Sequence, residues 1–373
     1  MRYALAFVLT VHGLIHLMGF AKAFGYAALP QLVIPISRPM GLMWLLATLL
    51  LLAAAVALWV APRAFWILGA AGLVVSQGVI VASWGDARFG TLANVVVLAA
   101  VAYGAFAWGP LGLRADYMRR ASIALDGLVA QPPSVITESD LAPLPAPVQR
   151  YLRFTGVVGQ PRVQSFHVRM NGRIRGAADA PWMTLTAEQY SFFNPPRRYF
   201  FMQATRAGLP LDGLHAYAED GASMRIKLLS MFPVVDLKGL VLTRTETVTV
   251  LNDMAIMAPA TLIDPAIRWR QIDDQQVEAI FTNGPNEVRA VLVFDATGAL
   301  SNFWSDDRPA LAADGVTLQP QRWSTPVGRY QSQGKYRLAS RGEARYAAPS
   351  GDYAYAEFDG IEVTAGDAAP GPR

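Results

Sequence analysis

The chain has 373 residues, of which 53% are hydrophobic and only 16% are charged. It is too apolar for one ordinary soluble domain and too long for a small one, so a membrane part joined to a soluble part is expected. The net charge of +4 is small and no basic tract interleaved with aromatic residues is present, which argues against nucleic acid as a partner. The absence of cysteine excludes disulfides, thiol catalysis, cysteine zinc sites and iron–sulfur clusters.

Four windows in the first third of the chain are apolar enough to cross a bilayer, which takes about 20 such residues. Tryptophans near the ends of the windows support these boundaries, because an indole favours the membrane interface. The first window could instead be a cleaved signal peptide, but its length, its two histidines and the three spans that follow favour an uncleaved helix. We predict a four-helix transmembrane domain over residues 1–112, with spans at roughly Tyr3–Ala21, Met40–Val60, Ala64–Trp84 and Thr91–Trp108.

The positive residues flanking these spans predict the topology. An even number of spans puts both chain ends on one side, and that side carries more arginines than the other. The sequence therefore favours a multi-pass protein of the bacterial inner membrane, with both termini and the soluble domain in the cytoplasm. The residues compared are Arg2, Arg63, Arg114, Arg119 and Arg120 on the terminus side, and Lys22, Arg38 and Arg88 on the other.

Two histidines four residues apart interrupt the first span, in "VHGLIHLMGF". Residues at i and i+4 share one side of a helix, so His12 and His16 are expected to face the bundle interior together. They either hydrogen-bond to neighbouring helices, for example to Ser76 or Gln77, or form a proton, quinone or substrate site. Metal or haem ranks last, because no other histidine lies in a span. The candidate intramembrane ligand-binding residues are His12, His16, Gln77, Asp86, Arg88 and Asn94.

Residues 113–147 are predicted to connect the two parts. Leu113–Ala130 is amphipathic and is expected to lie along the membrane surface or to extend the last helix, and Gln131–Pro147 is a proline-rich linker. The domain boundary is expected near residue 135, with a short helix over Val148–Phe154.

From residue 162 onward, apolar and polar residues alternate with the period of two that is typical of half-buried strands. Dipeptides suited to tight turns separate these runs, which predicts an antiparallel meander. The expected turns are Asn171-Gly172, Asp220-Gly221, Asn283-Gly284, Thr297-Gly298 and Asp314-Gly315. Beyond a first strand around Phe166–Met170, the expected strands are Met183–Phe193, Tyr199–Thr205, Leu214–Ala218, Ala222–Leu229, Val277–Thr282, Val288–Phe294, Tyr330–Leu338 and Tyr353–Val363.

The segment Thr243–Asp264 is ambiguous, because "TRTETVTV" favours a strand while the apolar residues that follow keep helical spacing. We predict one helix that packs in the concave side of a curved sheet, since an open sheet must bury its inner face. The predicted fold class is therefore α+β: a four-helix transmembrane bundle, then a soluble antiparallel half-barrel over 148–363 packed on this helix. Residues 364–373 are predicted to be a disordered tail.

These residues resemble a family of bacterial multi-pass proteins of uncharacterised function, whose soluble part is a domain of unknown function. The soluble half also resembles the half-barrel folds of lipoprotein carriers. The family resemblance implies no established activity, and Asp253 and Ala255 stand where it predicts Glu and an aromatic residue, which weakens any catalytic role for position 253. The motifs are "HGLIHLMGFAKAFG" (12–25), "LPQLVIPISRPMGLMWLL" (29–46), "WGDARFGTLANVV" (84–96), "LPAPVQRYLRFTG" (144–156), "LNDMAIMAPATLIDPAIRWRQID" (251–273) and "GEARYAAPSGDYAYAEFDGIEV" (342–363).

No phosphate loop, G-x-S-x-G elbow, H-E-x-x-H pair or dinucleotide fingerprint is present, so no catalytic residue, metal site or cofactor is identified and a non-enzymatic role is favoured. Scattered carboxylates, Glu246 and Asp253 among them, could form an acid/base pair only if the fold joins two of them. His167 and His215 are expected to be solvated on polar strand faces. The candidate ligand-binding residues of the soluble domain are Asn252, Met254, Trp269, Asp307, Arg308 and Trp323.

The soluble domain is rich in aromatic residues, which either pack an ordinary core or line an apolar cavity. The favoured function is a membrane-anchored binding module for an apolar or lipid-like ligand, with the bilayer and that ligand as partners. The alternatives are a membrane enzyme or redox partner with a polar intramembrane site around His12 and His16, and a membrane assembly scaffold. The aromatic residues considered are Trp182, Phe192, Phe193, Phe200, Trp269, Phe281, Phe294, Phe303, Trp304 and Trp323.

Overall fold

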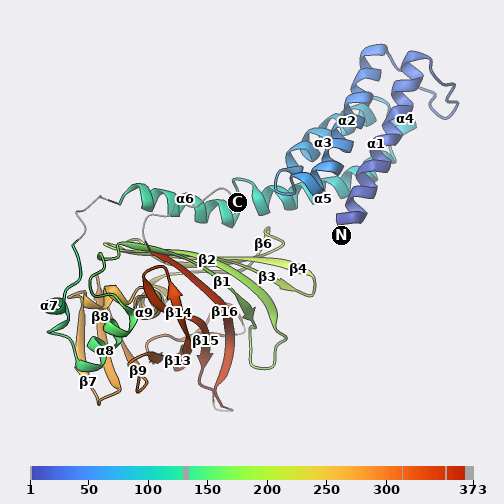
Figure 1. Cartoon of the computed structure of the whole chain (residues 1–373). Coiled ribbons are helices and arrows are strands. Elements are labelled where there is room, and N and C mark those ends of the chain that lie inside the picture. The colour runs from blue at the N-terminus through green and yellow to red at the C-terminus, as the bar shows by residue number, and fades with distance from the viewer. Residues whose placement is uncertain (1, 129–133, 313, 349–350, 366–373) are drawn as a thin grey trace. The chain divides into compact units, whose positions relative to one another are not determined.

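The computed structural model of the chain describes residues 2–128, 134–312, 314–348 and 351–365. These residues divide into two compact units, Met1–Ala115 and Asp116–Arg373 (Figure 1). Each unit has a hydrophobic core of its own. The predicted fold class is confirmed: apolar helices come first in the chain, and a curved antiparallel sheet with one long internal helix follows.

The first unit is a bundle of α-helices. In the part of the chain that is described, four helices are long and apolar enough to cross a membrane, and the last runs from Gly90 to Asp126 when α6 is included. Their positions match the four predicted windows. The helices are α1 (Arg2–Phe24), α2 (Arg38–Val60), α3 (Phe65–Ala82), the short α4 (Trp84–Ala87) and α5 (Gly90–Trp108). Helix α6 (Leu113–Asp126) begins in this unit and belongs to the second unit from Asp116 onward.

Small residues bring these helices into close contact, which is the usual basis of packing in a bilayer. Gly19 of α1 lies against the ring of Trp44 in α2, and Gly104 of α5 lies against Trp66 in α3. A methyl group at either glycine would overlap the facing side chain, so neither position accepts even alanine without a shift of the helices.

The second unit is built on one antiparallel sheet of 14 strands, whose order is β6-β5-β4-β3-β2-β1-β16-β15-β13-β10-β9-β8-β7, with β14 also paired to β15. The strands are β1 (Ser165–Ile174), β2 (Met183–Phe193), β3 (Pro196–Arg206), β4 (Leu209–Ala218), β5 (Gly221–Leu228), β6 (Phe232–Lys238), β7 (Ile267–Gln271), β8 (Gln276–Asn283), β9 (Asn286–Phe294), β10 (Leu300–Ser305), β13 (Trp323–Ser324), β14 (Val327–Gln333), β15 (Tyr336–Tyr346) and β16 (Tyr353–Ala365). The short pair β11 (Ala310–Leu311) and β12 (Leu318–Gln319) forms a separate ribbon. The helices of this unit are α7 (Glu138–Leu141), α8 (Ala146–Thr155), α9 (Leu240–Met257) and a 3₁₀ turn (Pro259–Ile263).

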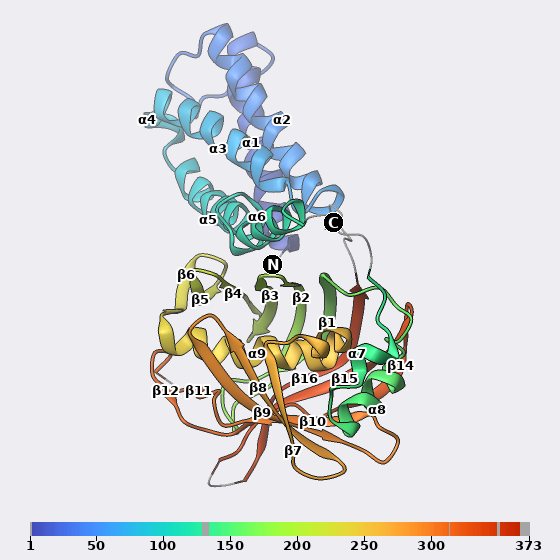
Figure 2. The ribbon, with the colours of Figure 1, turned by 90° about the vertical axis from the view of Figure 1, so that its left-hand side faces the viewer.

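Helix α9 runs along the inside of the curved sheet, as the sequence predicts (Figure 2). The predicted helix Thr243–Asp264 is too long at its end, because α9 stops at Met257 and Pro259–Ile263 form a 3₁₀ turn. Its β-branched threonines do not prevent the helix, because their hydroxyls donate to carbonyls four residues back, for example Thr245 Oγ1 to Val241 O at 2.8 Å. Nearly every residue from Leu242 to Ile256 is buried. Burial on all sides therefore outweighs the strand propensity of "TRTETVTV".

One face of α9 belongs to the main core. Val248, Leu251 and Ala255 are fully buried among side chains of β8, β9 and α8. Tyr151 of α8 donates its phenol hydrogen to the carbonyl of Ala255 at 2.8 Å. This contact joins α8 to α9 and leaves the opposite face of α9 turned toward β1–β5.

Helix α6, from Asp116 onward, packs against the outer face of the sheet. Phe201 of β3 points to this face, because its neighbours Phe200 and Met202 line the inner side. Tyr117 is fully buried and its ring lies 5.7 Å from that of Phe201, while Asp116 forms an ion pair with Arg225 of β5. The segment that was predicted to lie on the membrane surface or to extend the last helix therefore packs against this sheet from Asp116 onward.

Two predictions about the meander are wrong. Asn171-Gly172 is no turn but lies within β1 at a β-bulge opposite β16, where the backbone of Glu357 leaves no room for a side chain on Gly172. Tyr330–Leu338 is not one strand but parts of β14 and β15, joined by a turn in which Gly334 has a φ of +61°. The other four expected turns are present. Of the predicted tail, residues 364 and 365 extend β16 and the rest lie outside the described residues.

Candidate functional site

A cavity of about 800 Å³ lies between α9 and the concave face of the sheet. Its walls come from strands far apart in the sequence, β1–β6 on one side and β15 and β16 on another, and from the β11–β12 ribbon. Most of the lining is aliphatic or thioether, including Met170, Met183, Met202, Met224, Ile226, Met257 and Ile361.

The face of α9 that borders the cavity is polar. Leu242, Thr245, Glu246, Thr249, Asn252, Asp253 and Ile256 line it, at the i, i+3, i+4 spacing of one helix face. An ordinary core helix would present apolar residues here. The cavity is therefore amphipathic, with a mainly apolar sheet wall and a charged helix wall.

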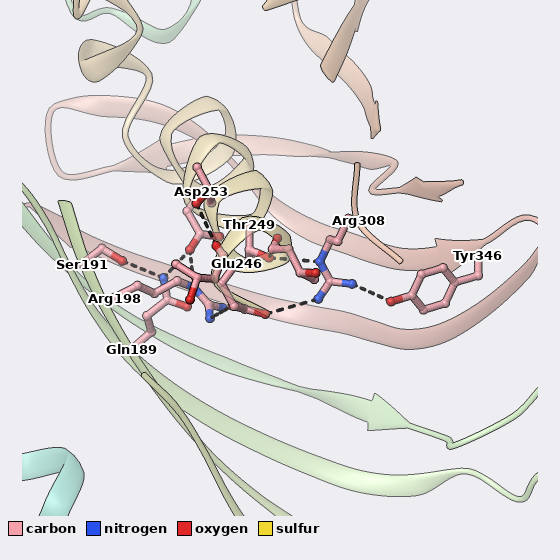
Figure 3. Close-up of polar contacts among 11 residues, drawn as sticks. Gln189, Ser191, Arg198, Glu246, Thr249, Asp253, Arg308 and Tyr346 are labelled. Carbon is pink, nitrogen blue, oxygen red and sulfur yellow. Dashed lines mark hydrogen bonds and ion pairs between the residues drawn. The ribbon is translucent and has the colours of Figure 1, made fainter. Parts of the chain in front are cut away.

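Two arginines from other elements meet the carboxylates of α9 in one row of buried charges (Figure 3). Arg198 of β3 donates from Nε to Asp253 Oδ2 at 2.7 Å and from Nη1 to Glu246 Oε2 at 3.2 Å. Gln189 of β2 donates to the same Asp253 oxygen at 2.7 Å. Arg308 follows β10 and brings its Nη2 to 3.9 Å from Glu246 Oε1. The row thus runs Asp253, Arg198, Glu246, Arg308.

Arg308 is held in place by neutral groups. Its Nε donates to Thr249 Oγ1 at 3.0 Å, its Nη1 donates to the Tyr346 hydroxyl at 2.6 Å, and its guanidinium lies 4.2 Å from the ring centre of Trp323. The Trp323 indole in turn donates to Tyr355 OH at 3.1 Å. These contacts fix the guanidinium plane at the cavity wall.

Burial and the neighbouring charges perturb the titration of this row. Burial pushes the pKa of Glu246 upward, but the positive charges around it, Arg198 first, outweigh this effect and hold that pKa below its usual range. Burial raises the pKa of Asp253, and its bonds to Arg198 and Gln189 offset this only in part. Burial lowers the pKa of His215 to about 4. Glu246 is therefore the firmly ionised acid of the row, and His215 is neutral near pH 7.

The expectation that both histidines of this domain are solvated is wrong. His215 lines the cavity from β4, next to the ring of Phe200. His167 is 8% exposed on the outer face, where its Nε2 lies 2.9 Å from Glu188 Oε1 and its ring stacks on Tyr190. The fold buries both, because α9 covers one face of the sheet and α6 covers the other.

The candidate residues of the soluble domain fall into two groups. Asn252, Arg308 and Trp323 line the cavity, and Asn252 donates to Thr325 Oγ1 at 2.6 Å. Met254 lies in the main core, Trp269 lies on β7 away from the cavity, and Asp307 pairs with Arg244 at 2.7 Å. Met254 follows Asp253 directly, but one helical step of about 100° turns it toward the core.

The aromatic residues mostly pack the core instead of lining the cavity. Phe281, Phe294 and Phe303 are buried in the main core, whereas Phe200 and Trp323 border the cavity. The sequence reading missed Gln189, Arg198 and Tyr346 as wall residues. Only Gln189 lies in a predicted strand, and alternation along that strand does not say which face is inner; Arg198 and Tyr346 lie outside the predicted strands.

The first unit contains a polar network of its own. His12 Nε2 lies 2.9 Å from Asn94 Oδ1 and 3.1 Å from Ser76 Oγ, and Asn94 donates to Gln77 Oε1 at 3.0 Å. Gln77 donates to Thr91 Oγ1 at 3.3 Å. The network joins α1, α3 and α5, so His12 makes the interhelical hydrogen bonds expected of it.

His16 differs from His12 because only one of its two ring nitrogens has a hydrogen-bond partner among the described residues. Its Nδ1 donates to the carbonyl of His12 at 2.8 Å, whereas its buried Nε2 has no partner among the described residues. The indole nitrogen of Trp44, whose ring centre lies 5.2 Å away, is also buried without a partner in that part of the chain. Asp86 and Arg88 stay apart from both groups: Asp86 accepts from the backbone of Ile34 at 2.7 Å, and Arg88 lies over Phe89.

Within the described ranges, no group of three His, Asp or Glu side chains is arranged to hold a metal ion. The two carboxylates of α9 in the cavity already bind arginine, and the histidines of the bundle bind amide, hydroxyl and carbonyl groups.

Several solved structures are similar to parts of this chain. A domain described as an outer membrane lipoprotein-sorting protein, from Vibrio parahaemolyticus, has 10% identity and a TM-score of 0.33, with 54% of this chain and 85% of that chain covered. A DUF1329 family protein from Desulfovibrio piger has 11% identity and a TM-score of 0.30, with 54% and 84% covered. A LolA superfamily protein from Nitrosomonas europaea has 12% identity and a TM-score of 0.29, with 62% and 92% covered. Likeness at this level transfers no function.

A comparison with curated proteins found no match. One family model matches residues 134–358, which is more than half of the chain and includes the cavity-lining residues up to Phe358. The chain therefore belongs to DUF6544, a family of unknown function.

Proposed function

We propose that this protein is a membrane-anchored binding module that holds an apolar or lipid-like ligand between α9 and the curved sheet. The observation that carries the proposal is the cavity of about 800 Å³ with its largely apolar wall. This volume falls within the range of about 300–1,000 Å³ that is typical of small-molecule sites. Each methylene group that a ligand buried there would contribute about 0.8 kcal/mol.

The composition of the wall suits a flexible chain. Five methionines line the cavity: Met170, Met183, Met202, Met224 and Met257. Unbranched thioether side chains adapt to irregular or varied apolar ligands at low cost. A ligand with long hydrocarbon segments is therefore a better match than a rigid, polar substrate.

The helical unit supports the same function. Four helices that can cross a membrane would keep the cavity close to a bilayer, where lipid-like molecules are concentrated. We further propose that the membrane is the bacterial inner membrane and that the second unit lies on its cytoplasmic side, as the excess of arginines on the terminus side favours.

Photo-crosslinking tests the proposal on the full chain. The protein, reconstituted in phosphatidylcholine nanodiscs, is exposed to a diazirine-bearing long-chain alcohol, and the labelled peptides are mapped by mass spectrometry. Peptides of β3, β5 and α9 should be labelled, and excess unlabelled alcohol should compete. Ile226→Trp places an indole inside the cavity and should reduce this labelling.

Ser223→Trp is the matched control, because Ser223 lies on the same strand but on its other face. It should leave the labelling unchanged. If the cavity peptides of the wild type are unlabelled, or if Ile226→Trp labels as well as the wild type, the cavity is not a binding site for a hydrocarbon chain.

The unpaired nitrogens of His16 and Trp44 support a second candidate function in the bundle. The Nδ1 of His16 carries a hydrogen, since it donates to a carbonyl, so a neutral His16 offers an acceptor at Nε2 while Trp44 offers a donor. A hydroxyl group, as in a quinol, satisfies both. Extraction of the purified protein should then yield quinol from the wild type and from Val11→Ala, but not from His16→Phe. Equal amounts from wild type and His16→Phe would eliminate this candidate.

A further inference from the structure

We propose that the cavity ligand is an amphiphile with an anionic headgroup, a carboxylate or a phosphate, which binds the cavity-facing Nη2 groups of Arg198 and Arg308 beside Glu246. This inference rests on the proposed function, because it assigns the polar end of the same ligand. It starts from the two guanidinium groups and from the hydrogen bonds that they do not make within the protein.

The row of buried charges has more donors than acceptors. Each guanidinium has five N–H donors. Arg198 makes its hydrogen bonds through Nε and Nη1, to Asp253 and Glu246, and Arg308 makes its own through Nε and Nη1, to Thr249 and Tyr346. Among the described residues, neither Nη2 has an acceptor within hydrogen-bond distance, since Glu246 Oε1 is 3.9 Å from Arg308 Nη2.

These spare donors face the ligand space. Arg198 and Arg308 both line the cavity, and neither Nη2 belongs to the polar atoms that are sealed in the interior without a partner. The side chains are nevertheless only 9% and 12% exposed. A hydrocarbon that filled the whole cavity would strip water from both Nη2 groups and give nothing in return, which is costly for charged donors.

The geometry favours an anion over other polar headgroups. The planar guanidinium fork matches the paired oxygens of a carboxylate or phosphate, and such charge-assisted bonds are about twice as strong as neutral ones. The Trp323 ring, one aromatic face that a cationic headgroup could use, is already covered by Arg308 at 4.2 Å.

The charge balance of the row is compatible with one added negative charge. Arg198 and Arg308 face Glu246 and Asp253, so the row is neutral when both acids are ionised. The raised pKa of Asp253 means that this acid takes up a proton more readily than usual, which compensates the charge of an incoming anion.

The test compares probes that share one hydrocarbon chain and differ only in headgroup. Full-length protein in phosphatidylcholine nanodiscs is titrated with diazirine-bearing palmitic acid, the matching alcohol and the matching lysophosphatidic acid, and cavity peptides are quantified. An anionic probe should reach half-maximal labelling at a concentration about tenfold lower than the alcohol does, or lower still, which corresponds to one net charge-assisted bond. A preference for the acid indicates a free carboxylate, and a preference for the phosphate indicates a phospholipid headgroup.

Substitutions of Arg308 test whether the preference for an anionic probe arises at this residue. Arg308→Met should remove the preference for the anion while leaving alcohol labelling in place. Arg322→Met is the matched control, because Arg322 also lies over a tryptophan, at 4.0 Å from the Trp304 ring, but is 50% exposed and away from the cavity. If Arg308→Met fails to fold, Arg308→Lys keeps the charge and loses the fork, and it should give an intermediate preference.

Failure of the anionic-headgroup proposal can be distinguished from failure of the binding-module proposal. Equal labelling of wild-type cavity peptides by the acid, the phosphate and the alcohol overturns the anionic headgroup and leaves the binding module intact. Labelling of no cavity peptide by any probe overturns the binding module itself. A preference for the anion that is undiminished in Arg308→Met, or in Arg308→Lys where Arg308→Met does not fold, also overturns the assignment, since the headgroup would then bind elsewhere.

Discussion

Replacement of Glu246 by alanine should strongly destabilise the second unit. Glu246 is 3% exposed and is the acid that lies between Arg198 and Arg308, at 3.2 and 3.9 Å. Its removal leaves two buried guanidinium groups with Asp253 as the remaining carboxylate of the row. Removing one partner of a buried ion pair costs about 3–5 kcal/mol, because the remaining charge stays desolvated.

This magnitude is large compared with the total stability of about 5–15 kcal/mol that is usual for a folded domain. At about 2–4 °C per kcal/mol for a unit of this size, the midpoint of thermal unfolding should fall by roughly 6–20 °C. The assay is thermal unfolding of the full chain followed by near-ultraviolet circular dichroism. Hydrogen exchange of α9 peptides shows whether the loss is local to the row.

The control is Glu138→Ala, which removes a carboxylate from an ion pair with Arg153 in which both side chains are largely exposed. It should leave the midpoint where it is. The double variant Glu246→Ala/Arg308→Met should recover part of the loss, because it removes one of the two unpaired cations. If Glu246→Ala unfolds at the same temperature as Glu138→Ala, water in the cavity solvates the arginines and the row is not a desolvated ion-pair system.

Three further variants test separate parts of the structure. The pKa of His215 lies at about 4 in the folded protein, below its unfolded value of about 6.5, so the folded state binds fewer protons between these values. Stability should therefore fall as the pH drops from about 6.5 toward 4, and His215→Gln should flatten this part of a denaturation-versus-pH curve. An unchanged slope in the variant would mean that His215 is solvated. Gly172→Ala should destabilise the sheet by about 1–3 kcal/mol through its clash at the β-bulge, whereas Gly176→Ala, with open space around it, should not. Equal urea midpoints for the two would contradict the bulge. His12→Ala should lower the stability of the bundle by about 0.6–2 kcal/mol, measured by unfolding in detergent mixtures, and Val11→Ala on the exposed face of α1 should have a smaller effect.

Local sequence patterns were sufficient to predict most of the helices and strands. The four long apolar helices follow from composition, because each is a continuous apolar segment of the length that crossing a bilayer would require. The meander follows from alternation and from turn glycines, but the helix predicted to reach Asp264 ends before Pro259. The pairing of His12 with other helices followed from its spacing and from the cost of a buried polar group. The prediction failed at Asn171-Gly172, where a turn-forming dipeptide serves a bulge within a strand.

The charged residues of the cavity could not be predicted without the tertiary structure. Arg197 and Arg198 are neighbours of the same type, yet Arg197 pairs near the surface with Glu219 while Arg198 reaches the buried Glu246 and Asp253. Alternation along β3 separates the two side chains to opposite faces, but only the curvature of the sheet around α9 makes one of those faces the inner one. The sequence by itself determined that long apolar helices and an antiparallel sheet would form, because these depend on the period and length of local apolar patterns. The tertiary structure decided which charges became buried and shared a cavity, because that depends on contacts between strands and a helix far apart in the chain.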